Sequence, residues 1–462
     1  MRQHQVAIVG LGPTGAVLAN LLGRRGVRTV VYEQSSAPYA QPRACHLDGE
    51  IARVLQQCGL GDVLETVLTR SSGMEYVSAE GERLFTFEGF ERAPLLGWHE
   101  DYVFVQPQLD ALVRSTLGTQ STVEVHVGAA APPLADLLEI ADFVVGCDGA
   151  SSPTRSAIGS ALDDLGYDER WLVVDIEVHD SADPVLPAII QQVCDPRRLA
   201  TFVPSHGNHR RWEFHLADGE QPDPWELLRP WRVTPTKATL LRSAAYRFHA
   251  LLARAWRGGP QGRVFLAGDA AHQMPPFMGQ GMCTGIRDAA NLAWKLAEVV
   301  ERRDGDEAAS TASEDALLDS YMTERAEHTQ RVIELSIEAG RLLGQIAGDL
   351  AAGRTPHVPV PAAPDMRLWS RLPALALGGD YPIGHLVPQP DVDGRRLDDL
   401  LDEQGTHGWA WIAADESFVA PDARPVIVSP AAAMGCVAVL VRPDRYVAAT
   451  ALSGGAGAPA GA

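Results

Sequence analysis

The sequence has almost no lysine and no long apolar run. Only Lys237 and Lys295 of its 39 basic residues are lysines, and 59 acidic residues leave a net charge of −20. This excess of acid argues against a nucleic-acid or anionic-membrane surface, because both need basic patches. No segment reaches the roughly 20 uninterrupted apolar residues of a membrane span. Glycines and Pro13 interrupt the apolar stretch from Val6 to Leu22, unlike a signal peptide. The composition predicts a cytoplasmic protein with no nucleic-acid or membrane partner.

Cysteine is scarce as well. The six cysteines form no Cys-x-x-Cys pair and have no spacing to histidine that fits a zinc site. We therefore expect free thiols in a reducing compartment and no metal. With 462 residues, of which 46% are apolar and 21% charged, the chain has room for about three domains, or for one large core with additions.

The first motif is a glycine-rich turn between two short apolar segments. The segment Gln5–Val9 is typical of a buried strand and leads into Gly10-Leu11-Gly12-Pro13-Thr14-Gly15, after which the pattern is helical. A second buried strand, Thr29–Tyr32, ends at Glu33. Strand, glycine turn, helix, strand and acid in this order predict a dinucleotide-binding unit.

Each residue type in this turn has a physical role. Gly10 permits the tight turn, Gly12 lets the backbone approach a pyrophosphate, and Gly15 allows close helix packing. The helix N-terminus offers N–H groups and a positive dipole end to phosphate. Glu33 can accept hydrogen bonds from ribose hydroxyls and would repel a 2′-phosphate, so the pattern favours FAD or NAD over NADP.

Two later segments repeat the form of a strand that ends in glycine and acid. Phe143–Val145 leads to Gly146-Cys147-Asp148-Gly149, and Arg263–Ala267 leads to Gly268-Asp269. A long helix is predicted to begin near Gly281. Together with the first motif, three such strand ends could surround one extended cofactor.

On these three motifs the chain resembles the FAD-dependent aromatic hydroxylases, single-component flavoprotein monooxygenases with a p-hydroxybenzoate-hydroxylase-like fold. Residues 268–296, together with Pro42-Arg43-Ala44, Gln106-Pro107-Gln108-Leu109 and Arg210–Phe214, are most similar to the 3-(3-hydroxyphenyl)propionate hydroxylase branch. The resemblance covers most of residues 5–340 and returns at 383–446.

The resemblance implies an α/β fold in which a Rossmann-like FAD-binding domain is interleaved with a mixed β-sheet substrate domain. The expected boundaries are 1–169 and 261–350 for the FAD-binding domain, 170–260 for the substrate domain and 351–382 for a linker. Residues 383–452 are expected to form a small, reduced thioredoxin-like unit, which lacks Cys-x-x-Cys, and 453–462 a disordered tail.

The resemblance also implies roles for side chains. Arg43 would neutralise the FAD diphosphate, Gln106 would bond the ribityl part, and Asp269 would bind the ribityl or pyrophosphate region. The loop before the long helix would present N–H groups to the flavin N1/O2 edge, where reduction places negative charge. The predicted cofactor-binding residues are Gly10, Gly12, Pro13, Thr14, Gly15, Glu33, Gln34, Arg43, Gln106, Asp148, Gly149, Gly268, Asp269, Pro276, Gly279, Gln280, Gly281 and Met282.

Substrate and proton-transfer residues are less well defined by the sequence. Trp212, Phe214 and Pro275 are candidate substrate contacts, although either face of the strand Arg210–Leu216 could roof the pocket. His46 and His272 are candidates for a base that removes a phenol proton. A protein base is dispensable, however, where the cofactor carries the chemistry. Cys283 is expected to serve packing.

The predicted function is an FAD-dependent NAD(P)H:aromatic monooxygenase. With noncovalent FAD, NADH or NADPH and O₂, it would hydroxylate a phenolic small molecule through a C4a-(hydro)peroxyflavin. One alternative keeps the cofactor but predicts epoxidation or Baeyer–Villiger oxidation of a polyketide-like substrate. Another is a flavoprotein reductase that does not oxygenate. The sequence does not indicate the oligomeric state.

Overall fold

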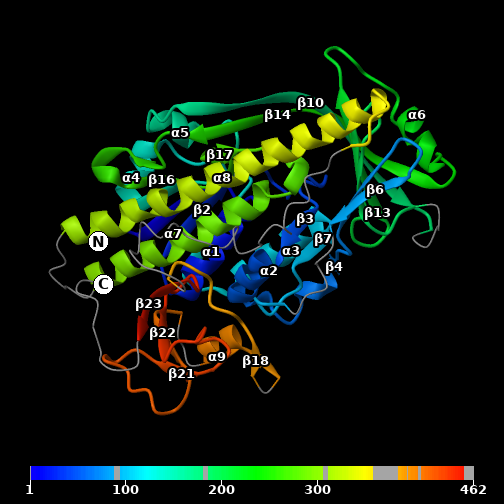
Figure 1. The fold of residues 1–462 in the computed structure, drawn as a ribbon. Coiled ribbons are helices and arrows are strands. Elements are labelled where there is room, and N and C mark those ends of the chain that lie inside the picture. Colours follow the sequence, from blue (N-terminus) through cyan, green and yellow to red (C-terminus); the bar gives the residue numbers. More distant parts are fainter. Residues whose placement is uncertain are drawn as a thin grey trace.

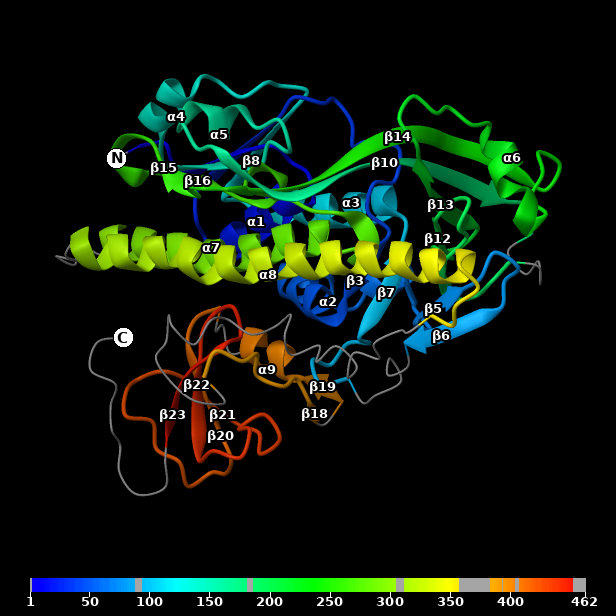
Figure 2. The same ribbon diagram turned by 45° about the horizontal axis from the view of Figure 1, so that its top comes forward.

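The computed structural model describes residues 2–87, 94–180, 186–304, 311–356, 383–392, 394–403 and 407–451. Most of the expected linker 351–382 and all of the expected tail 453–462 lie outside these residues. The chain forms two large sheets with helices packed on them and a smaller C-terminal unit below (Figures 1 and 2).

A six-stranded sheet contains the three strand ends that the sequence motifs predicted. Its order is β15-β16-β9-β1-β2-β8, and all neighbours except β15 and β16 pair in parallel. The strands are β1 (His4–Val9), β2 (Thr29–Glu33), β8 (Val123–Val127), β9 (Ala141–Gly146), β15 (Arg257–Gly258) and β16 (Val264–Leu266).

Helices cover both faces of this sheet, which explains why its central strands are apolar throughout. One face packs against α1 (Pro13–Arg24) and α7 (Gly281–Asp304), and the other against α4 (Leu134–Ile140). The helix α4 occupies the short connection between β8 and β9, where the sequence showed only a proline pair and few residues. The remaining helices are α2 (Gly49–Leu55), α3 (Gln106–Ser115), α5 (Pro153–Ala157), α6 (Pro224–Leu228), α8 (Thr311–Ala351) and α9 (Leu397–Glu403).

An eight-stranded mixed sheet contains the strands of residues 170–260, which were expected to form a substrate domain, together with strands from outside that range. Its order is β17-β14-β10-β13-β12-β11-β5-β6. The strands are β5 (Met74–Val77), β6 (Arg83–Phe87), β10 (Leu162–Val178), β11 (Ile190–Val193), β12 (Ala200–Val203), β13 (His209–Leu216), β14 (Ala238–Ala253) and β17 (His272–Gln273). The long β10 and β14 extend from beside the first sheet to the far end of the second, and α8 runs alongside them (Figures 1 and 2). A three-stranded sheet, β3-β7-β4 (His46–Asp48, Asp101–Phe104, Leu68–Arg70), lies nearby.

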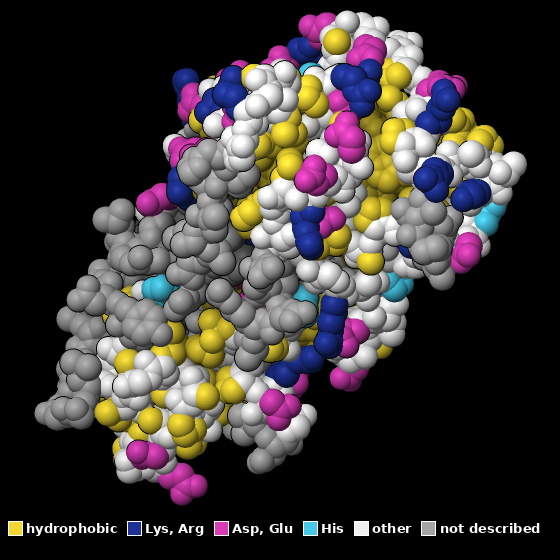
Figure 3. Space-filling view, turned by 45° about the vertical axis from the view of Figure 1, so that its right-hand side comes forward, with side chains coloured by type: hydrophobic (Ala, Val, Ile, Leu, Met, Phe, Trp, Pro, Cys, Tyr) yellow, Lys and Arg dark blue, Asp and Glu magenta, His cyan; other side chains and the backbone are white. Residues whose placement is uncertain are grey.

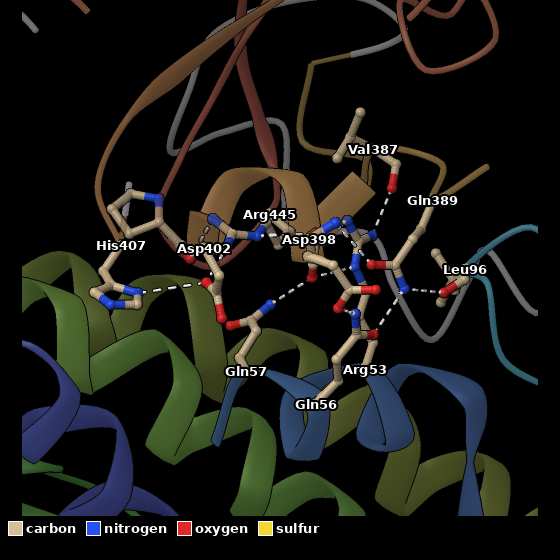
Figure 4. A network of polar contacts seen from close by, with 12 residues as sticks. Arg53, Gln56, Gln57, Leu96, Val387, Gln389, Asp398, Asp402, His407 and Arg445 are labelled. Atoms are coloured by element: carbon tan, nitrogen blue, oxygen red, sulfur yellow. Dashed lines mark hydrogen bonds and ion pairs between the residues drawn. The ribbon is translucent and has the colours of Figure 1, made fainter. Parts of the chain in front are cut away.

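The C-terminal unit is a four-stranded mixed sheet, β21-β20-β22-β23 (Val426–Val428, Ala410–Ala413, Ala438–Val441, Val447–Ala451), with α9 and the two-residue strands β18 (Asp391–Val392) and β19 (Arg395–Arg396). It docks on α2 through buried polar contacts (Figure 4). Arg53 donates to both oxygens of Asp398, at 2.9 and 2.7 Å, and Arg445 Nε donates to the same carboxylate at 3.1 Å. The thioredoxin-like character of this unit stays a prediction.

None of the helices in the described ranges is both long and apolar enough to cross a membrane. On the face drawn in Figure 3, acidic and basic side chains are interspersed rather than gathered by sign. That face therefore offers no continuous basic patch of the kind that nucleic acid requires.

The ion pairs of Asp398 predict how the C-terminal unit responds to acid. Burial alone would raise the pKa of this carboxyl, but Arg53 and Arg445 outweigh it and lower the pKa to about 2. Because the folded-state pKa is lowered, the stabilisation is complete above about pH 4 and is lost as the pH falls toward 2. We expect Asp398→Asn to lower the free energy of unfolding by about 3–5 kcal/mol at neutral pH, since it leaves two buried guanidinium groups without their carboxylate.

The measurement is denaturant and acid unfolding followed by tryptophan fluorescence. Glu403→Gln is the matched control on the same helix, because Glu403 pairs with Arg395 at the exposed surface and such pairs contribute about 0–1 kcal/mol. Equal unfolding midpoints for the two variants would contradict the docking role of Asp398.

Candidate cofactor and substrate site

The turn between β1 and α1 has the shape that a bound diphosphate requires. Gly10 has a φ of 99°, and a Cβ there would lie 2.4 Å from the Cys147 carbonyl oxygen. A Cβ at Gly15 would lie 2.1 Å from the Gly10 carbonyl oxygen, whereas one at Gly12 would meet nothing within 4 Å. The helix starts at Pro13 with no side-chain cap. Its N-terminus is therefore open to an anion, and this part of the site fits FAD.

Glu33 at the end of β2 lies beside the glycine turn, where the sequence predicts the adenosine ribose. Its carboxylate accepts hydrogen bonds from the Leu11 N–H at 2.9 Å and the Ser35 N–H at 2.8 Å. These bonds fix the carboxylate at the strand end, with the exposed Gln34 beside it. Ribose binding by Glu33 and Gln34 stays a prediction.

Gln106 holds the segment that carries Arg43. Its Oε1 accepts hydrogen bonds from the backbone N–H groups of Arg43 and Ala44, both at 2.8 Å, and its Nε2 donates to Asp110 at 3.3 Å. The Arg43 side chain is exposed and lies over the Tyr39 ring. The structure therefore gives Gln106 a positioning role, and its direct contact with a cofactor stays a prediction.

Asp148 serves a helix cap. Its carboxylate accepts hydrogen bonds from the Ser152 hydroxyl and from the Thr154 N–H at 2.9 Å, at the start of α5. Arg155 on that helix donates to the carbonyls of Ala150 and Ala270, at 2.7 and 2.9 Å. The motif thus ties the loop after β9 to the loop after β16, and leaves Gly149, with a φ of 83°, at the turn.

The loop after β16 presents one carboxylate without a protein donor. Gly268 has a φ of 63°, and a Cβ there would lie 2.6 Å from Thr14 Oγ1, so only glycine fits between the two loops. Asp269 next to it is exposed and has no hydrogen bond to any described residue. Surrounding protein nevertheless displaces much of its hydration and raises the pKa of its carboxyl, although His272 and Arg43 act against this. A carboxylate in this position fits the hydroxyl groups of a ribityl chain.

His272 lies beneath this loop and not beside a reacting ring. It is 1% exposed, and its Nε2 is 2.7 Å from Asp288, which also accepts from the Gly268 N–H at 3.1 Å. His272 thus shares Asp288 with the Gly268 N–H, an arrangement that fits positioning of the Gly268–Asp269 loop, and its role as a catalytic base stays a prediction.

His46 lies directly under the loop that was expected at the flavin edge. This loop contains the short turn Pro276–Met278, preceded by the buried Pro275, and then Gly279, with a φ of 62°. A Cβ at Gly279 would lie 2.6 Å from the His46 Nδ1. Burial disfavours a charged imidazole there, but the ion pair with Asp101 outweighs it and raises the pKa of His46 well above its ordinary value. An imidazole with a raised pKa under Gly279 suits stabilisation of negative charge at this loop, and a role of His46 as a base stays a prediction.

The other side chains of this loop region face the protein. Burial raises the pKa of the Cys283 thiol, which fits a packing role. Gln280 Nε2 donates to Asp48 at 3.1 Å, and its Oε1 accepts from Arg287 at 2.9 Å. The Gln280 side chain is therefore occupied, and the Gly279 N–H donates to the Pro276 carbonyl at 2.8 Å. The N–H groups of Gln280 and Gly281 are left to face a cofactor, and Met282 is half-buried.

Arg287 connects this loop to the C-terminal unit. It donates to Asp48 at 2.6 Å and to Glu50 at 2.7 Å, in addition to Gln280. The other Glu50 oxygen accepts from the Tyr446 hydroxyl at 2.8 Å. A chain of buried hydrogen bonds thus runs from the C-terminal unit to the loop before α7. Sequence reasoning gave no role to Arg287, although it lies within residues 268–296, or to Asp101, because the partners of both are set by contacts between separate elements.

The two faces of the eight-stranded sheet differ in what they contact. Trp212 and Phe214 are 0% and 2% exposed and pack with Trp231 and other apolar residues near α6. The opposite face carries Trp171, whose ring lies 5.3 Å from that of Phe277 in the turn at Pro276–Met278. The face that adjoins the candidate flavin loop is therefore the one opposite Trp212 and Phe214. Trp212 and Phe214 thus pack in the core on the face away from this loop, and their contact with substrate stays a prediction.

Comparison with known proteins agrees with this site. A family model described as an FAD binding domain matches residues 3–131 and 139–336. The chain is 32% identical over 96% of its length to a probable NADH-specific resorcinol 4-hydroxylase from Rhodococcus jostii, of which it covers 91%. It is 35% identical over 86% of its length to a 3-(3-hydroxy-phenyl)propionate/3-hydroxycinnamic acid hydroxylase from Mycolicibacterium smegmatis, of which it covers 74%.

Solved structures share the fold. Aklavinone-11 hydroxylase in a complex with FAD and aklavinone superposes with a TM-score of 0.75 at 22% identity, over 98% of this chain and 96% of that one. The anhydrotetracycline hydroxylase OxyS from Streptomyces rimosus gives a TM-score of 0.74 at 23% identity, over 97% and 96% of the two chains. These likenesses confirm the expected α/β architecture.

The free carboxylate of Asp269 predicts the effect of its removal. We expect Asp269→Ala to weaken FAD binding about ten- to a hundredfold, because hydrogen bonds to a charged acceptor contribute roughly 1.5–3 kcal/mol. Flavin retained after dialysis, followed by absorbance, measures the change. Asp142→Ala is the control. Asp142 lies at the N-terminal end of β9, away from the cofactor loops, and its one ion pair among the described residues is with Arg2. Full occupancy in Asp269→Ala would show that the ribityl chain binds elsewhere.

Proposed function

This chain belongs to the FAD binding domain family and is an FAD-dependent aromatic hydroxylase, and we propose that it hydroxylates a small phenol of the resorcinol type with NADH as the electron donor. The observation that carries the substrate class is a relative named for resorcinol that this chain matches over nearly its whole length. The aromatic pair Trp171 and Phe277 on the sheet face beside the flavin loop supports a planar aromatic substrate.

We assign the cofactor-holding roles as follows. The open N-terminus of α1 would hold the diphosphate with Arg43 near it, Glu33 the ribose, and Asp269 the ribityl chain. Bound FAD would accept hydride from NADH and activate O₂. The N–H groups of Gln280 and Gly281, with the His46 imidazole under Gly279, would stabilise negative charge at the adjoining ring edge.

The chain's own side chains would also exclude water from the reacting ring. Trp171 and Phe277 are 1% and 8% exposed and pack in one apolar cluster with Tyr76 and Tyr167. A dry wall of this kind favours oxygen transfer over loss of the oxidant as hydrogen peroxide. The balanced reaction consumes NADH, a proton, O₂ and the phenol, and yields NAD⁺, water and the ring with one additional hydroxyl.

A second candidate substrate is a hydroxyphenylpropionate. A relative named for this substrate matches a smaller share of the chain, 86%, than the resorcinol hydroxylase does. Epoxidation or Baeyer–Villiger oxidation of a larger substrate, and reduction without oxygenation, are the competing reactions. Product mass separates the oxygenations from reduction, because only the oxygenations add an oxygen atom. Hydroxylation, epoxidation and Baeyer–Villiger oxidation all add one oxygen atom and are distinguished by the NMR spectrum of the product.

We expect the purified protein to be yellow, to release FAD on acid precipitation, and to oxidise NADH faster when resorcinol is present. With ¹⁸O₂, the product should contain one labelled oxygen atom and be a trihydroxybenzene by mass spectrometry. Resorcinol-stimulated NADH oxidation that yields only hydrogen peroxide would contradict the proposed substrate. FMN, or flavin that stays with the precipitated protein, would contradict the cofactor assignment.

A further inference from the structure

Glu169 on β10 is a half-buried carboxylate that binds two buried aromatic side chains. Tyr167, Glu169 and Trp171 alternate along the strand and share one face. The Tyr167 hydroxyl donates to Glu169 Oε2 at 2.7 Å, and the Trp171 Nε1–H donates to the same oxygen at 3.1 Å. Tyr167 and Trp171 are 7% and 1% exposed, whereas the Glu169 side chain is 40% exposed. The carboxylate therefore lies where the aromatic wall meets water, and it orients both rings from there.

The protonation of Tyr167 fixes the direction of its bond to Glu169. Burial raises the pKa of the Tyr167 hydroxyl, and the hydrogen bond to Glu169 raises it further. The hydroxyl is therefore neutral and donates its proton to the carboxylate, which can only accept. His215 Nε2 lies 3.9 Å from the same oxygen, beyond hydrogen-bond distance. The two aromatic donors thus supply the side-chain hydrogen bonds of Glu169 in the described part of the chain.

The two rings that Glu169 orients both meet Phe277 in the loop before α7. The Phe277 ring centroid lies 5.3 Å from that of Trp171 and 5.9 Å from that of Tyr167, with interplanar angles of 77° and 83°. These are edge-to-face contacts, whose energy depends on how the rings are oriented. A rotation of either ring on β10 would therefore change the place that Phe277 can occupy.

Helix α8 makes room for the same Phe277 ring. A Cβ at Gly340 would lie 2.4 Å from Phe277 Cε2 and 2.8 Å from its Cδ2. Glycine inside a helix costs roughly 0.5–1 kcal/mol relative to alanine, so a glycine here needs a packing reason, and the ring of Phe277 supplies it. Ile333 and Ile337 on α8 pack in the same apolar cluster as Phe277. Phe277 is thus held by contacts with two separate elements, β10 and α8.

Phe277 lies in the turn that leads to the residues facing the cofactor. The Gly279 N–H donates to the Pro276 carbonyl at 2.8 Å, which closes the turn around Phe277. Gln280 and Gly281, whose N–H groups are left to face a cofactor, follow directly. A displacement of Phe277 would therefore move these N–H groups.

We infer that Glu169 is a positioning residue: by orienting two aromatic rings of β10 it fixes Phe277, and with it the loop before α7, against the cofactor. The inference rests on the proposed function for what this loop faces. With the loop in place, NADH oxidation ends in hydroxylated phenol. With the loop displaced, water reaches the site, and NADH, a proton and O₂ yield NAD⁺ and hydrogen peroxide instead. Glu169 acts in this way without touching the substrate.

The test compares Glu169→Leu with Glu169→Gln in the holoenzyme, with resorcinol as the phenol. Leucine leaves the Tyr167 hydroxyl and the Trp171 N–H without an acceptor, whereas the glutamine Oε1 can accept from both. We expect Glu169→Leu to lower the hydroxylated product formed per NADH consumed about three- to tenfold, since a misplacement of about 1 Å can cost a hundredfold in rate. Amide hydrogen exchange of residues 275–282, followed by mass spectrometry, should be faster in this variant. Glu169→Gln should keep most of both properties.

Two further variants separate positioning from a general structural role. Gly340→Ala presses on Phe277 from α8 and should lower the product ratio as well. Because both changes act through one ring, the double variant with Glu169→Leu should lose less than the product of the two separate factors.

Asp168→Asn is the matched control on β10. Its carboxylate is 48% exposed and pairs with Arg247 and His249, so the product ratio and the loop exchange should not change. FAD occupancy should be the same in every variant. If Glu169→Leu leaves the product ratio and the exchange of residues 275–282 unchanged, or lowers only the thermal midpoint, the inference is wrong.

Hydrogen exchange also distinguishes this inference from the proposed function. If the wild-type holoenzyme oxygenates no phenol, the proposed function fails, while the exchange of residues 275–282 in Glu169→Leu still decides the role of Glu169. If the wild type oxygenates resorcinol and Glu169→Leu does so with the same product ratio and the same loop exchange, the proposed function stands and the assignment of Glu169 is overturned.

Discussion

Two consecutive charged residues buried in α7, Arg287 and Asp288, hold the loops on which the candidate site depends. They are 3% and 0% exposed, and an unpaired charge at that depth would cost several kcal/mol. Arg287 is paired only when the start of α2 and the side chain of Gln280 are in place. Asp288 accepts from the Gly268 N–H and contacts His272 through one oxygen, and Arg325 on α8 donates to its other oxygen at 2.9 Å. One helix thereby fixes both the loop after β16 and the loop at its own N-terminus.

The same constraint explains why the C-terminal unit belongs to the site. Tyr446 completes the hydrogen bonding of Glu50, the acid that pairs with Arg287. Arg442 pairs with Glu324 on α8 at 2.8 Å, and Glu324 in turn is 2.9 Å from Lys295 on α7. Burial lowers the pKa of Lys295 to about 8, with Glu324 opposing the shift, so this pair too depends on its partners. The C-terminal unit thus stabilises α7 from the side opposite the cofactor loops, without contributing a residue to them.

The sequence predicted what short segments determine by themselves. The strands of the parallel sheet, the glycine turn and the Gly268–Asp269 strand end follow from local apolar runs and from glycine geometry, and the structure contains all of them. The sequence could not predict which face of β13 meets the cofactor loop. Side chains alternate along a strand, so either face can be the inner one until the neighbouring elements are known. The roles of His46 and His272 were ambiguous for a related reason. Their partners, Asp101 and Asp288, are set by tertiary contacts between separate elements.

The cofactor loops and the eight-stranded sheet are separate parts of the fold. The cofactor site is built from loops whose geometry is set by the cofactor and is the same for any substrate. Helix α7 holds these loops in place. In the proposed function the substrate side is one face of the eight-stranded sheet, whose long strands β10 and β14 pair along almost their whole length. Exchanging side chains on that face changes neither the pairing of these strands nor the buried charges of α7. Relatives with one cofactor fold can therefore act on different rings, and substrate choice in this chain must be sought on that face of the sheet, which the cofactor motifs do not include.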